Sequence, residues 1–464
     1  MLRNYEKSWE SPRLDYYWHH NFVHQIYSQH ILEKYLLFQE KSIIAINSHD
    51  SYTFYIERTD YDLYVKKFYL SSNYFFDWLH AIDELQKIIS ALPWCTCSKS
   101  VSQLFKTINY YEGLFHHAVA LHYVSQPHFT NCLHKELLAI LSKRMTPQRA
   151  ELLIRHYSTP EELPNVIIEQ LEWFDIVMRQ PTGFDLDRAI QEHLKKWKYI
   201  TAGDSKAPMN QEYLKGRFEK DSVNLTGIAL YCDTISKSYA KKDLSLFSNQ
   251  EREYIKKLQI VSFRRFCTKA MWMKLWYLLE QNLLELQTQL NIPEIFQYTL
   301  KELQDGTFLK EDNRKTYVYI STSNKYDLYY NGLDYSFLRD SAVDFSQTSK
   351  LVGEIGYKGD RVTGRVVKVD WNDDVNKKLE EITDNTILVL PQVLPAYVGL
   401  LFRCKGLVVD EGGITGHASI IARELKIPSI IGVKHATKVF NDGDSIILDF
   451  DNQCVEKIMM EDLS

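Results

Sequence analysis

The sequence predicts a multidomain α and α/β protein, with a large, mostly α-helical N-terminal domain followed by a smaller C-terminal α/β domain. Glycine is concentrated at one end, since 11 of the 18 glycines lie at or beyond Gly353. Aromatic residues show the opposite bias, because 28 of the 30 tyrosines and eight of the nine tryptophans precede residue 340. Apolar residues recur at helical spacing in the first part and form short runs between turns in the second. These changes place the two domains at residues 1–340 and 351–464.

Helical periodicity and the positions of the prolines predict the helices of the first domain. In chain order, the expected helices cover residues 75–92, 101–123, 132–141, 164–179, 186–197, 250–289 and 295–304. We expect a break within residues 250–289. The density of aromatic side chains in these helices is more typical of a core than of a cofactor site.

Short runs of Val, Ile and Leu bounded by turn residues predict the strands of the second domain. They cover residues 365–369, 386–390, 406–409, 429–433 and 445–449. Between the two domains, residues 341–350 read SAVDFSQTSK, which is small, polar and without periodicity. This segment is therefore predicted to be a linker.

Composition excludes several classes of function. The net charge is -5 and there is no long basic run, which argues against nucleic acid or an anionic membrane as a partner. No apolar segment is long enough to span a bilayer, and the N-terminus lacks the apolar stretch of a signal peptide, so we expect a cytoplasmic protein. The seven cysteines are scattered and are expected to be reduced thiols. No metal site is predicted, because the adjacent pairs His19-His20 and His116-His117 would point apart on a helix.

One histidine lies in a setting that suggests chemistry. In GGITGHASIIAREL, residues 412–425, His417 follows three nearby glycines and stands at the start of an expected helix. The glycines permit positive φ or a close approach of the backbone to a ligand. The helix is predicted from apolar residues at helical spacing after the histidine: Ala418, Ile421, Ala422 and Leu425.

The start of a helix suits an anion and a neutral imidazole. Free backbone N–H groups and the positive end of the helix dipole point there, which disfavours imidazolium and keeps His417 a neutral nucleophile near pH 7. A neutral ring nitrogen can accept a phosphoryl group, and the product would sit among backbone donors and the Thr415 hydroxyl. Imidazole is a good leaving group, so the phosphoryl group would stay labile.

Four spaced blocks carry a family resemblance: GYKGDRVTGRVVKV, NTILVLPQVLP, GLVVDEGGITGHASIIARELKIPSIIGV and NDGDSIILDFDNQCVEKI. From residue 351 onward the chain resembles the phosphohistidine, or mobile, domain of the phosphoenolpyruvate-utilising enzymes, which include phosphoenolpyruvate synthase, pyruvate phosphate dikinase and the rifampicin phosphotransferases. The resemblance implies a swivelling β/β/α domain in which His417 is the catalytic residue that is phosphorylated.

By the same resemblance, Thr415, Gly416 and Arg423 are the phosphate-binding residues. For Arg423 a surface ion pair is an equal alternative, because six residues along a helix place it off the face of His417. Two features depart from the family pattern. Gly416 stands where Ser, Cys or Ala is commoner, and residues 393–395 read Val-Leu-Pro where Thr-x-Pro is usual.

Weaker resemblances extend into the helical part. IFQYTLKEL and the preceding SFRRFCTKAMWMKL are similar to segments of phosphoenolpyruvate synthase-like proteins, and HLKKWKYI is a third candidate. An ATP-grasp module, usual in the family, is not recognisable in the first 340 residues, which hold seven glycines and no GxxxxGK loop. We therefore expect no cofactor to be bound by this chain alone, with ATP and Mg on a partner subunit.

Two functions follow from this organisation. In the first, the chain is an enzyme, the phosphotransferase component of a split dikinase-type system. A separate ATP-grasp protein phosphorylates His417, and the phosphoryl group passes to a small-molecule acceptor held by the acceptor-binding helical domain, residues 1–340. In the second, the chain is a non-catalytic phosphohistidine carrier or a partner-docking protein.

Overall fold

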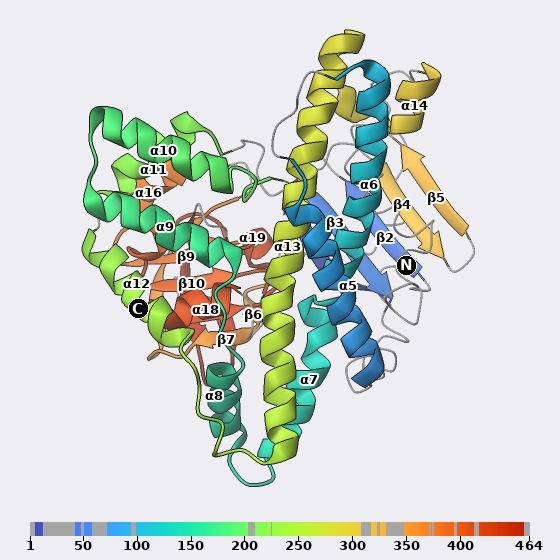
Figure 1. Cartoon of the computed structure of the whole chain (residues 1–464). Coiled ribbons are helices and arrows are strands. Elements are labelled where there is room, and N and C mark those ends of the chain that lie inside the picture. Colours follow the sequence, from blue (N-terminus) through green and yellow to red (C-terminus); the bar gives the residue numbers. More distant parts are fainter. Residues whose placement is uncertain are drawn as a thin grey trace. The chain divides into compact units, whose positions relative to one another are not determined.

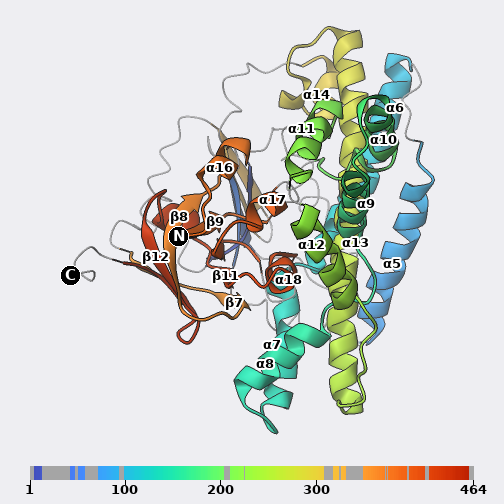
Figure 2. The same cartoon turned by 90° about the vertical axis from the view of Figure 1, so that its left-hand side faces the viewer.

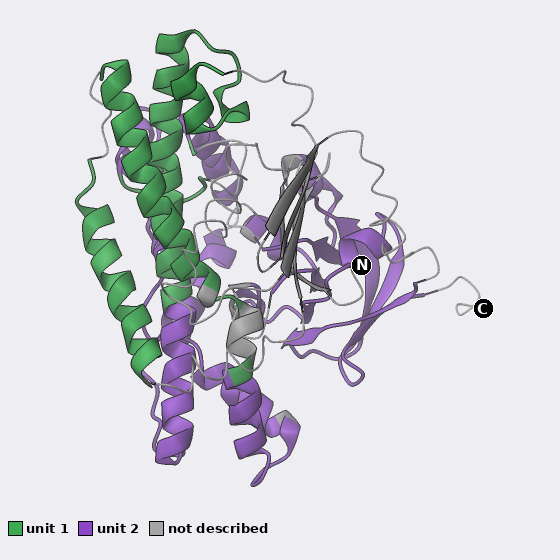
Figure 3. Ribbon diagram, turned by 90° about the vertical axis from the view of Figure 1, so that its right-hand side faces the viewer, with its two compact units in different colours: residues 1–132, 196–209, 264–341 green, residues 133–195, 210–263, 342–464 purple. Residues whose placement is uncertain are grey.

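The computed structural model describes residues 5–12, 42–47, 51–57, 72–93, 99–202, 209–223, 225–307, 317–322, 325–330, 348–370, 373, 375–393, 397–412 and 417–458 (Figure 1). Contacts between Cα atoms divide the chain into two compact units, which Figure 3 colours separately. Unit 1 is Met1–Cys132, Lys196–Met209 and Arg264–Ser341, and unit 2 is Leu133–Lys195, Asn210–Phe263 and Ala342–Ser464. Unit 2 thus combines helices from the first half of the chain with the C-terminal segment. The boundaries predicted from composition stay a prediction, and residues 341–347 of the expected linker lie outside the described residues.

Helices form most of the described part of unit 1. The main ones are α5 (Ser72–Ser90), α6 (Val101–Val124) and the part of α13 (Asn249–Leu290) from Arg264 onward, followed by the 3₁₀ turn η3 (Ile295–Gln297) and α14 (Leu300–Asp305). Hydrogen bonds from buried side chains connect the long helices. Trp78 Nε1 on α5 donates to the Leu121 carbonyl of α6 at 3.1 Å, and Lys274 Nζ on α13 donates to the Ile89 carbonyl at 2.8 Å. The last bond satisfies a carbonyl at the C-terminal end of α5.

Unit 1 also contains an antiparallel sheet that the sequence reading missed. Its strands are β1 (Tyr5–Pro12), β2 (Ser42–Asn47), β3 (Ser51–Glu57), β4 (Tyr317–Thr322) and β5 (Lys325–Tyr330), in the spatial order β1-β3-β2-β4-β5. Strand β2 pairs with β4, which lies far along the chain. The N-terminal part is therefore mostly helical, but it is not helical throughout.

The helices of unit 2 precede its sheet in the chain. They are α7 (Pro127–Leu141, which begins in unit 1), α8 (Pro147–Tyr157), α9 (Asn165–Arg179), α10 (Gly183–Trp197), α11 (Gln211–Asp221), α12 (Leu225–Ser238) and the first turns of α13. The expected break in residues 250–289 is wrong, because α13 is continuous. Helices α8, α11 and α12 were not predicted. Pro147 marks the first turn of α8, with Thr146 as its N-cap, and does not interrupt a helix.

A buried ion network joins α9, α10 and α11. The Glu169 carboxylate is 0% exposed, and its Oε1 lies 2.8 Å from Arg217 Nη1 and 3.0 Å from His193 Nε2. The guanidinium of Arg217 also stacks over the ring of Trp173 and lies 3.5 Å from Asp221 Oδ2. Burial raises the pKa of Glu169, but the charge of Arg217 and the bond to His193 outweigh burial and hold this pKa below its ordinary value.

The C-terminal segment forms a mixed sheet of eight strands, in the order β6-β13-β12-β8-β9-β10-β11-β7. Strands β8, β9, β10 and β11 are parallel neighbours, and the remaining pairs are antiparallel. The strands are β6 (Lys350–Val352), β7 (Glu354–Tyr357), β8 (Val362–Lys368), β9 (Thr386–Leu390), β10 (Gly406–Val409), β11 (Ser429–Ile431), β12 (Ser445–Asp449) and β13 (Cys454–Lys457). Every residue of β9, β10 and β11 is buried, as expected for parallel strands covered on both faces.

Short helices connect these strands: α16 (Val375–Glu381), α17 (Val398–Leu401), α18 (His417–Glu424) and α19 (Ala436–Val439). The core between sheet and helices includes Val366, Ile387, Val408, Ile430 and Phe440. The predicted strands are confirmed within a few residues. None of the described helices has both the length and the apolar composition needed to cross a membrane.

Close packing in this sheet leads to a first prediction. A Cβ added to Gly364 on β8 would lie 2.6 Å from the Asn385 carbonyl oxygen, whereas one added to Gly113 on α6 would meet no atom within 4 Å. Gly364→Ala should therefore lower the free energy of unfolding by about 1–3 kcal/mol, because backbone must shift to make room. Gly113→Ala is the control and should raise it by about 0.5–1 kcal/mol. Urea denaturation measures both, and equal effects would contradict the packing described here.

Candidate functional site

The site is centred on the connection from β10 to α18. Strand β10 is parallel to both β9 and β11, so Asp410, the residue that follows β10, lies at the carboxyl end of a central strand. In open α/β sheets this edge is where ligands commonly bind. His417 is the first residue of α18, as predicted. Thr415 and Gly416 lie outside the described residues.

Asp410 is the first residue after β10, and its hydrogen bonds fix this end of the strand. Its carboxylate is buried and accepts hydrogen bonds from the backbone N–H of Ala436 and from the backbone N–H and hydroxyl of Thr437. Its own carbonyl accepts from Lys434 N–H at 2.9 Å. These bonds tie the end of β10 to the turn after β11. The sequence reading did not single out Asp410, although an aspartate directly after an apolar strand was a visible signal.

Two glycines bring the same turn close to the start of the loop. Gly412 has φ +128° and Gly432 has φ +66°, both in the region that favours glycine. A Cβ on Gly432 would lie 3.0 Å from the Gly412 carbonyl oxygen. The expectation that Gly412 serves a special backbone conformation is confirmed.

Helix α18 is held by its apolar face. Ala418, Ile421 and Ala422 are buried, as their spacing predicted, whereas Leu425, the fourth residue of that spacing, follows α18 and is only partly buried. Helix α18 contacts β7, β11 and α12 (Figure 2). The helix therefore presents its N-terminal turn at the carboxyl edge of the parallel strands. The first turn of an α-helix carries backbone N–H groups without intrahelical partners and the positive end of the dipole. This geometry suits an anionic group on the first residue, His417.

Arg423 lies at the other end of α18 and contacts helix α8. Its Nη1 donates to the Arg155 carbonyl at 2.5 Å, and its Nη2 lies 3.4 Å from the Thr159 hydroxyl oxygen. Its Nε donates to the Ser419 carbonyl at 3.2 Å. A phosphate contact by Arg423 stays a prediction, and the guanidinium would have to leave these acceptors to make one.

The neighbourhood of Thr159 is rich in basic groups. Lys242 Nζ donates to the carbonyls of Thr159 at 3.0 Å and Ser238 at 2.9 Å. Burial lowers the pKa of His156, and the nearby charges of Lys242 and Arg423 lower it further. His156 is therefore neutral at pH 7.

The helices with weaker family resemblance have structural contacts. Arg264 on α13 pairs with Asp83 on α5, with Nη1 2.7 Å from Oδ1. His193, in HLKKWKYI, belongs to the buried network around Glu169. In the part of the chain that is described, no group of three His, Cys, Asp or Glu side chains could hold a metal ion.

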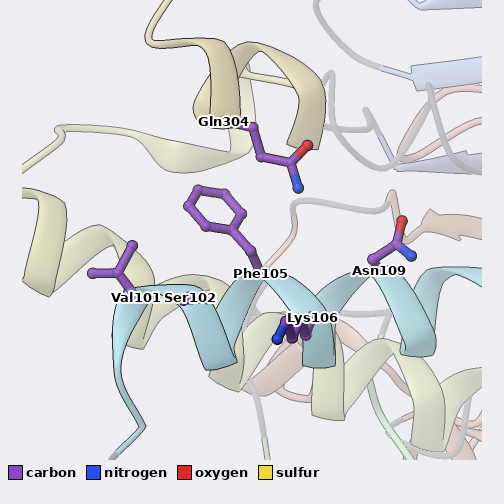
Figure 4. A pocket seen from close by; sticks show the side chains of 6 residues that line it. All are labelled: Val101, Ser102, Phe105, Lys106, Asn109 and Gln304. Carbon is purple, nitrogen blue, oxygen red and sulfur yellow. The ribbon is translucent and has the colours of Figure 1, made fainter.

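A cavity of about 660 Å³ opens in unit 1 between α6 and α14. In Figure 4 the Phe105 ring and the Gln304 amide extend into it from opposite sides. Its other lining residues are Val101, Ser102, Lys106 and Asn109. The pocket is largely open to solvent, unlike the concave sites that enclose most of a ligand's surface.

Comparison with known proteins supports the reading of the C-terminal segment. Residues 382–453 match the family described as PEP-utilising enzyme, mobile domain. A probable phosphoenolpyruvate synthase of Staphylothermus marinus is 36% identical over 91 residues, which are 20% of this chain and 11% of that protein. The phosphoenolpyruvate-protein phosphotransferase of Bacillus subtilis is 28% identical over 130 residues, 28% of this chain and 20% of that protein. The predicted resemblance to the mobile domain is confirmed, over about a tenth to a fifth of the length of these relatives.

Among solved structures, the crystal structure of Thermococcus kodakaraensis aconitase X in its holo-form aligns with 24% of this chain and 98% of that chain. The identity is 18% and the TM-score is 0.18.

Proposed function

We propose, from the mobile-domain match over residues 382–453, that this chain is the phosphohistidine component of a split dikinase-type phosphotransferase. A separate ATP-grasp protein, which holds ATP and Mg, phosphorylates His417. The phosphoryl group then passes to a small-molecule acceptor held by the helical part of the chain. The names of the similar proteins, a probable phosphoenolpyruvate synthase and a phosphoenolpyruvate-protein phosphotransferase, support phosphoryl transfer as the class of reaction.

The observation that carries this proposal is the place of His417 at the first position of α18, beyond the carboxyl end of β10. The N-terminus of a helix stabilises negative charge through its free N–H groups and its dipole. Phosphorylation adds about 1.5 to 2 negative charges near pH 7. The phosphorylated state of His417 therefore gains more from this position than the free state does.

Two transfers make up the proposed reaction. In the first, a ring nitrogen of neutral His417 attacks the phosphorus of the donor. By the family resemblance the attacked atom is the β phosphorus of ATP: a P–N bond forms, the P–O bond to AMP breaks, and the ring loses the proton on its other nitrogen. Before the second transfer, water attacks the γ phosphorus, the bond between the β and γ groups breaks, and inorganic phosphate leaves, so that His417 keeps the β phosphoryl group. In the second, an acceptor oxygen attacks the phosphorus, the P–N bond breaks, and the proton of the acceptor hydroxyl balances the one lost by the ring. We assign Thr415 and Gly416 to contacts with the phosphoryl group.

Co-purification tests the need for a partner. The tagged chain, recovered from its native host, should carry an ATP-grasp protein that mass spectrometry identifies. Recovery of the chain with non-enzymatic partners only would favour the alternative, a phosphohistidine carrier or docking protein.

A binding measurement tests the second prediction, that the isolated chain does not bind ATP. We expect no heat of binding when ATP and Mg²⁺ are titrated into the purified chain, because the nucleotide site belongs to the partner. His417→Asn is the matched control, since it removes any heat from slow phosphorylation. A micromolar Kd, about -8 kcal/mol, would place a nucleotide site in this chain and contradict the split arrangement.

A further inference from the structure

Asp410 continues the parallel pairing of the sheet past the end of β10. Its backbone N–H donates to the Leu390 carbonyl at the end of β9 at 2.9 Å, and its carbonyl accepts from the N–H of Lys434, beyond β11, at 2.9 Å. The residue is 3% exposed, so its carboxylate is buried together with these backbone groups. Asp410 is therefore held between the ends of the two neighbouring strands.

The carboxylate of Asp410 caps the first turn of α19. Its Oδ1 accepts from the backbone N–H of Ala436, and its Oδ2 accepts from the backbone N–H of Thr437 at 3.2 Å and from the Thr437 hydroxyl. The N-cap residue of α19, His435, makes no capping bond with its side chain. Asp410, 26 residues before Ala436, thus supplies the acceptor that the side chain of an N-cap residue usually supplies.

The turn that Asp410 fixes lies against the segment that leads to α18. A Cβ on Gly432, within this turn, would lie 3.0 Å from the Gly412 carbonyl oxygen. A Cβ on Gly412 would in turn lie 3.9 Å from the Cβ of Ala418, the second residue of α18. A continuous set of packed residues therefore leads from Asp410 to the first turn of α18.

We propose that Asp410 is a positioning residue for the phosphorylation of His417. Its carboxylate fixes the turn after β11, that turn supports Gly412, and Gly412 supports the first turn of α18. Backbone N–H groups stabilise developing negative charge best when their orientation is fixed before the reaction. Asp410 acts through this chain of contacts and does not itself touch the phosphoryl group. The proposal rests on the proposed function and adds to it the residue that sets the orientation of the helix start.

The direction of the hydrogen bonds makes the carboxylate difficult to replace. The three groups that donate to it are two backbone N–H groups and one hydroxyl. An asparagine at position 410 would have one acceptor oxygen, and in either orientation its NH2 group would face one of the two backbone N–H groups. A buried donor that loses its acceptor destabilises the local structure. Asp410→Asn keeps the side-chain volume, so it tests these bonds and not the packing.

Chemical phosphorylation tests the proposal without the partner. Potassium phosphoramidate phosphorylates histidine without an enzyme, and mass spectrometry at alkaline pH measures the rate of labelling at each histidine. His80, an exposed residue of α5, is the reference within the same molecule. We expect His417 of the wild type to be labelled about tenfold faster than His80. Asp410→Asn should lower this ratio of rates about tenfold, since outright removal of a donor aimed at developing charge costs about 10²–10³-fold and displacement costs less.

Three further variants separate positioning from general destabilisation. Thr437→Val removes the hydroxyl donor and keeps the backbone N–H, so the ratio should fall by about threefold only. Thr437→Ser keeps the hydroxyl and should behave like the wild type. Asp449→Asn is the matched control, because Asp449 also accepts three bonds, from the backbone N–H groups of Asp451 and Asn452 and from the Asn452 amide, but in the turn after β12. Its ratio should equal that of the wild type.

The outcomes distinguish the positioning role from the proposed function. With folding verified by circular dichroism, an unchanged ratio in Asp410→Asn and Thr437→Val would overturn the positioning role and leave the proposed function intact. An equal fall in Asp449→Asn would overturn it as well. If Asp410→Asn does not fold, the two Thr437 variants decide between the same outcomes. A wild-type chain in which His417 is labelled no faster than His80 would contradict the proposed function, and the positioning role with it.

Discussion

Replacing His417 with asparagine should abolish the acid-labile, base-stable phosphate that the wild-type chain acquires from its donor. Asparagine cannot form the P–N bond, and the loss should be complete because the mechanism has one nucleophile. Labelling with radioactive ATP in the presence of the co-purified partner measures the effect. The fold should not change, since His417 is the first residue of α18 and the buried face of that helix is supplied by Ala418, Ile421 and Ala422.

His435→Asn provides the control. His435 is the other histidine of residues 351–464, and it stands just before α19. This variant should be labelled like the wild type. Undiminished labelling of His417→Asn, or equal loss in both variants, would remove His417 from the role assigned to it.

The second large effect concerns stability. Arg217→Met should lower the free energy of unfolding by about 3–5 kcal/mol, because it leaves the carboxylate of Glu169 buried with one partner fewer. That carboxylate is 0% exposed, and its Oε2 has no hydrogen-bond partner among the described residues. Urea denaturation followed by circular dichroism measures the change.

The size of this effect should depend on pH. Arg217 and His193 hold the pKa of Glu169 below its ordinary value of 4.5, so the wild type gains stability from this group above pH 4.5 and loses it as the pH falls further. The difference in the free energy of unfolding between wild type and Arg217→Met should therefore become smaller below pH 4.5, where the Glu169 carboxyl group takes up a proton.

Arg179→Met is the matched control for the buried network. Arg179 pairs with Asp175 on the same helix, but the two side chains are 71% and 57% exposed. Removal of an exposed pair costs about 0–1 kcal/mol. If Arg179→Met and Arg217→Met lowered the free energy of unfolding equally, burial would not determine how much these ion pairs stabilise the protein.

The sequence was most informative where structure is local. Residues 386–390, 406–409 and 445–449 were predicted as strands and match β9, β10 and β12, because short apolar runs between turn residues have few other ways to be buried. The start of α18 at His417 was readable from the glycines before it and the apolar spacing after it. The antiparallel sheet of unit 1 was missed because its pairing is not local. Strand β2 pairs with β4, which lies far along the chain, and no pattern within either segment predicts that pairing.

The missed helices have a related explanation. Helix α11 buries Leu214 and carries several charged residues, so its sequence shows little periodicity, and its position depends on Arg217 reaching Glu169. At the site, the anchoring of Asp410 and the contact of Arg423 with α8 depend on residues 26 and 268 positions away. The role of His417 as the nucleophile stays a prediction from residue type and motif, whereas the contacts of Asp410 and Arg423 depend on tertiary structure.

Transfer of label from specific positions of ATP tests the central claim most directly. The chain and its co-purified ATP-grasp partner are incubated with ATP labelled in either the β or the γ phosphate, and the labelled residue is located by mass spectrometry. Our account predicts that His417 carries label from the β position, in a reaction that needs the partner. Label from the γ position alone, or label that stays on the partner and never reaches His417, would contradict it.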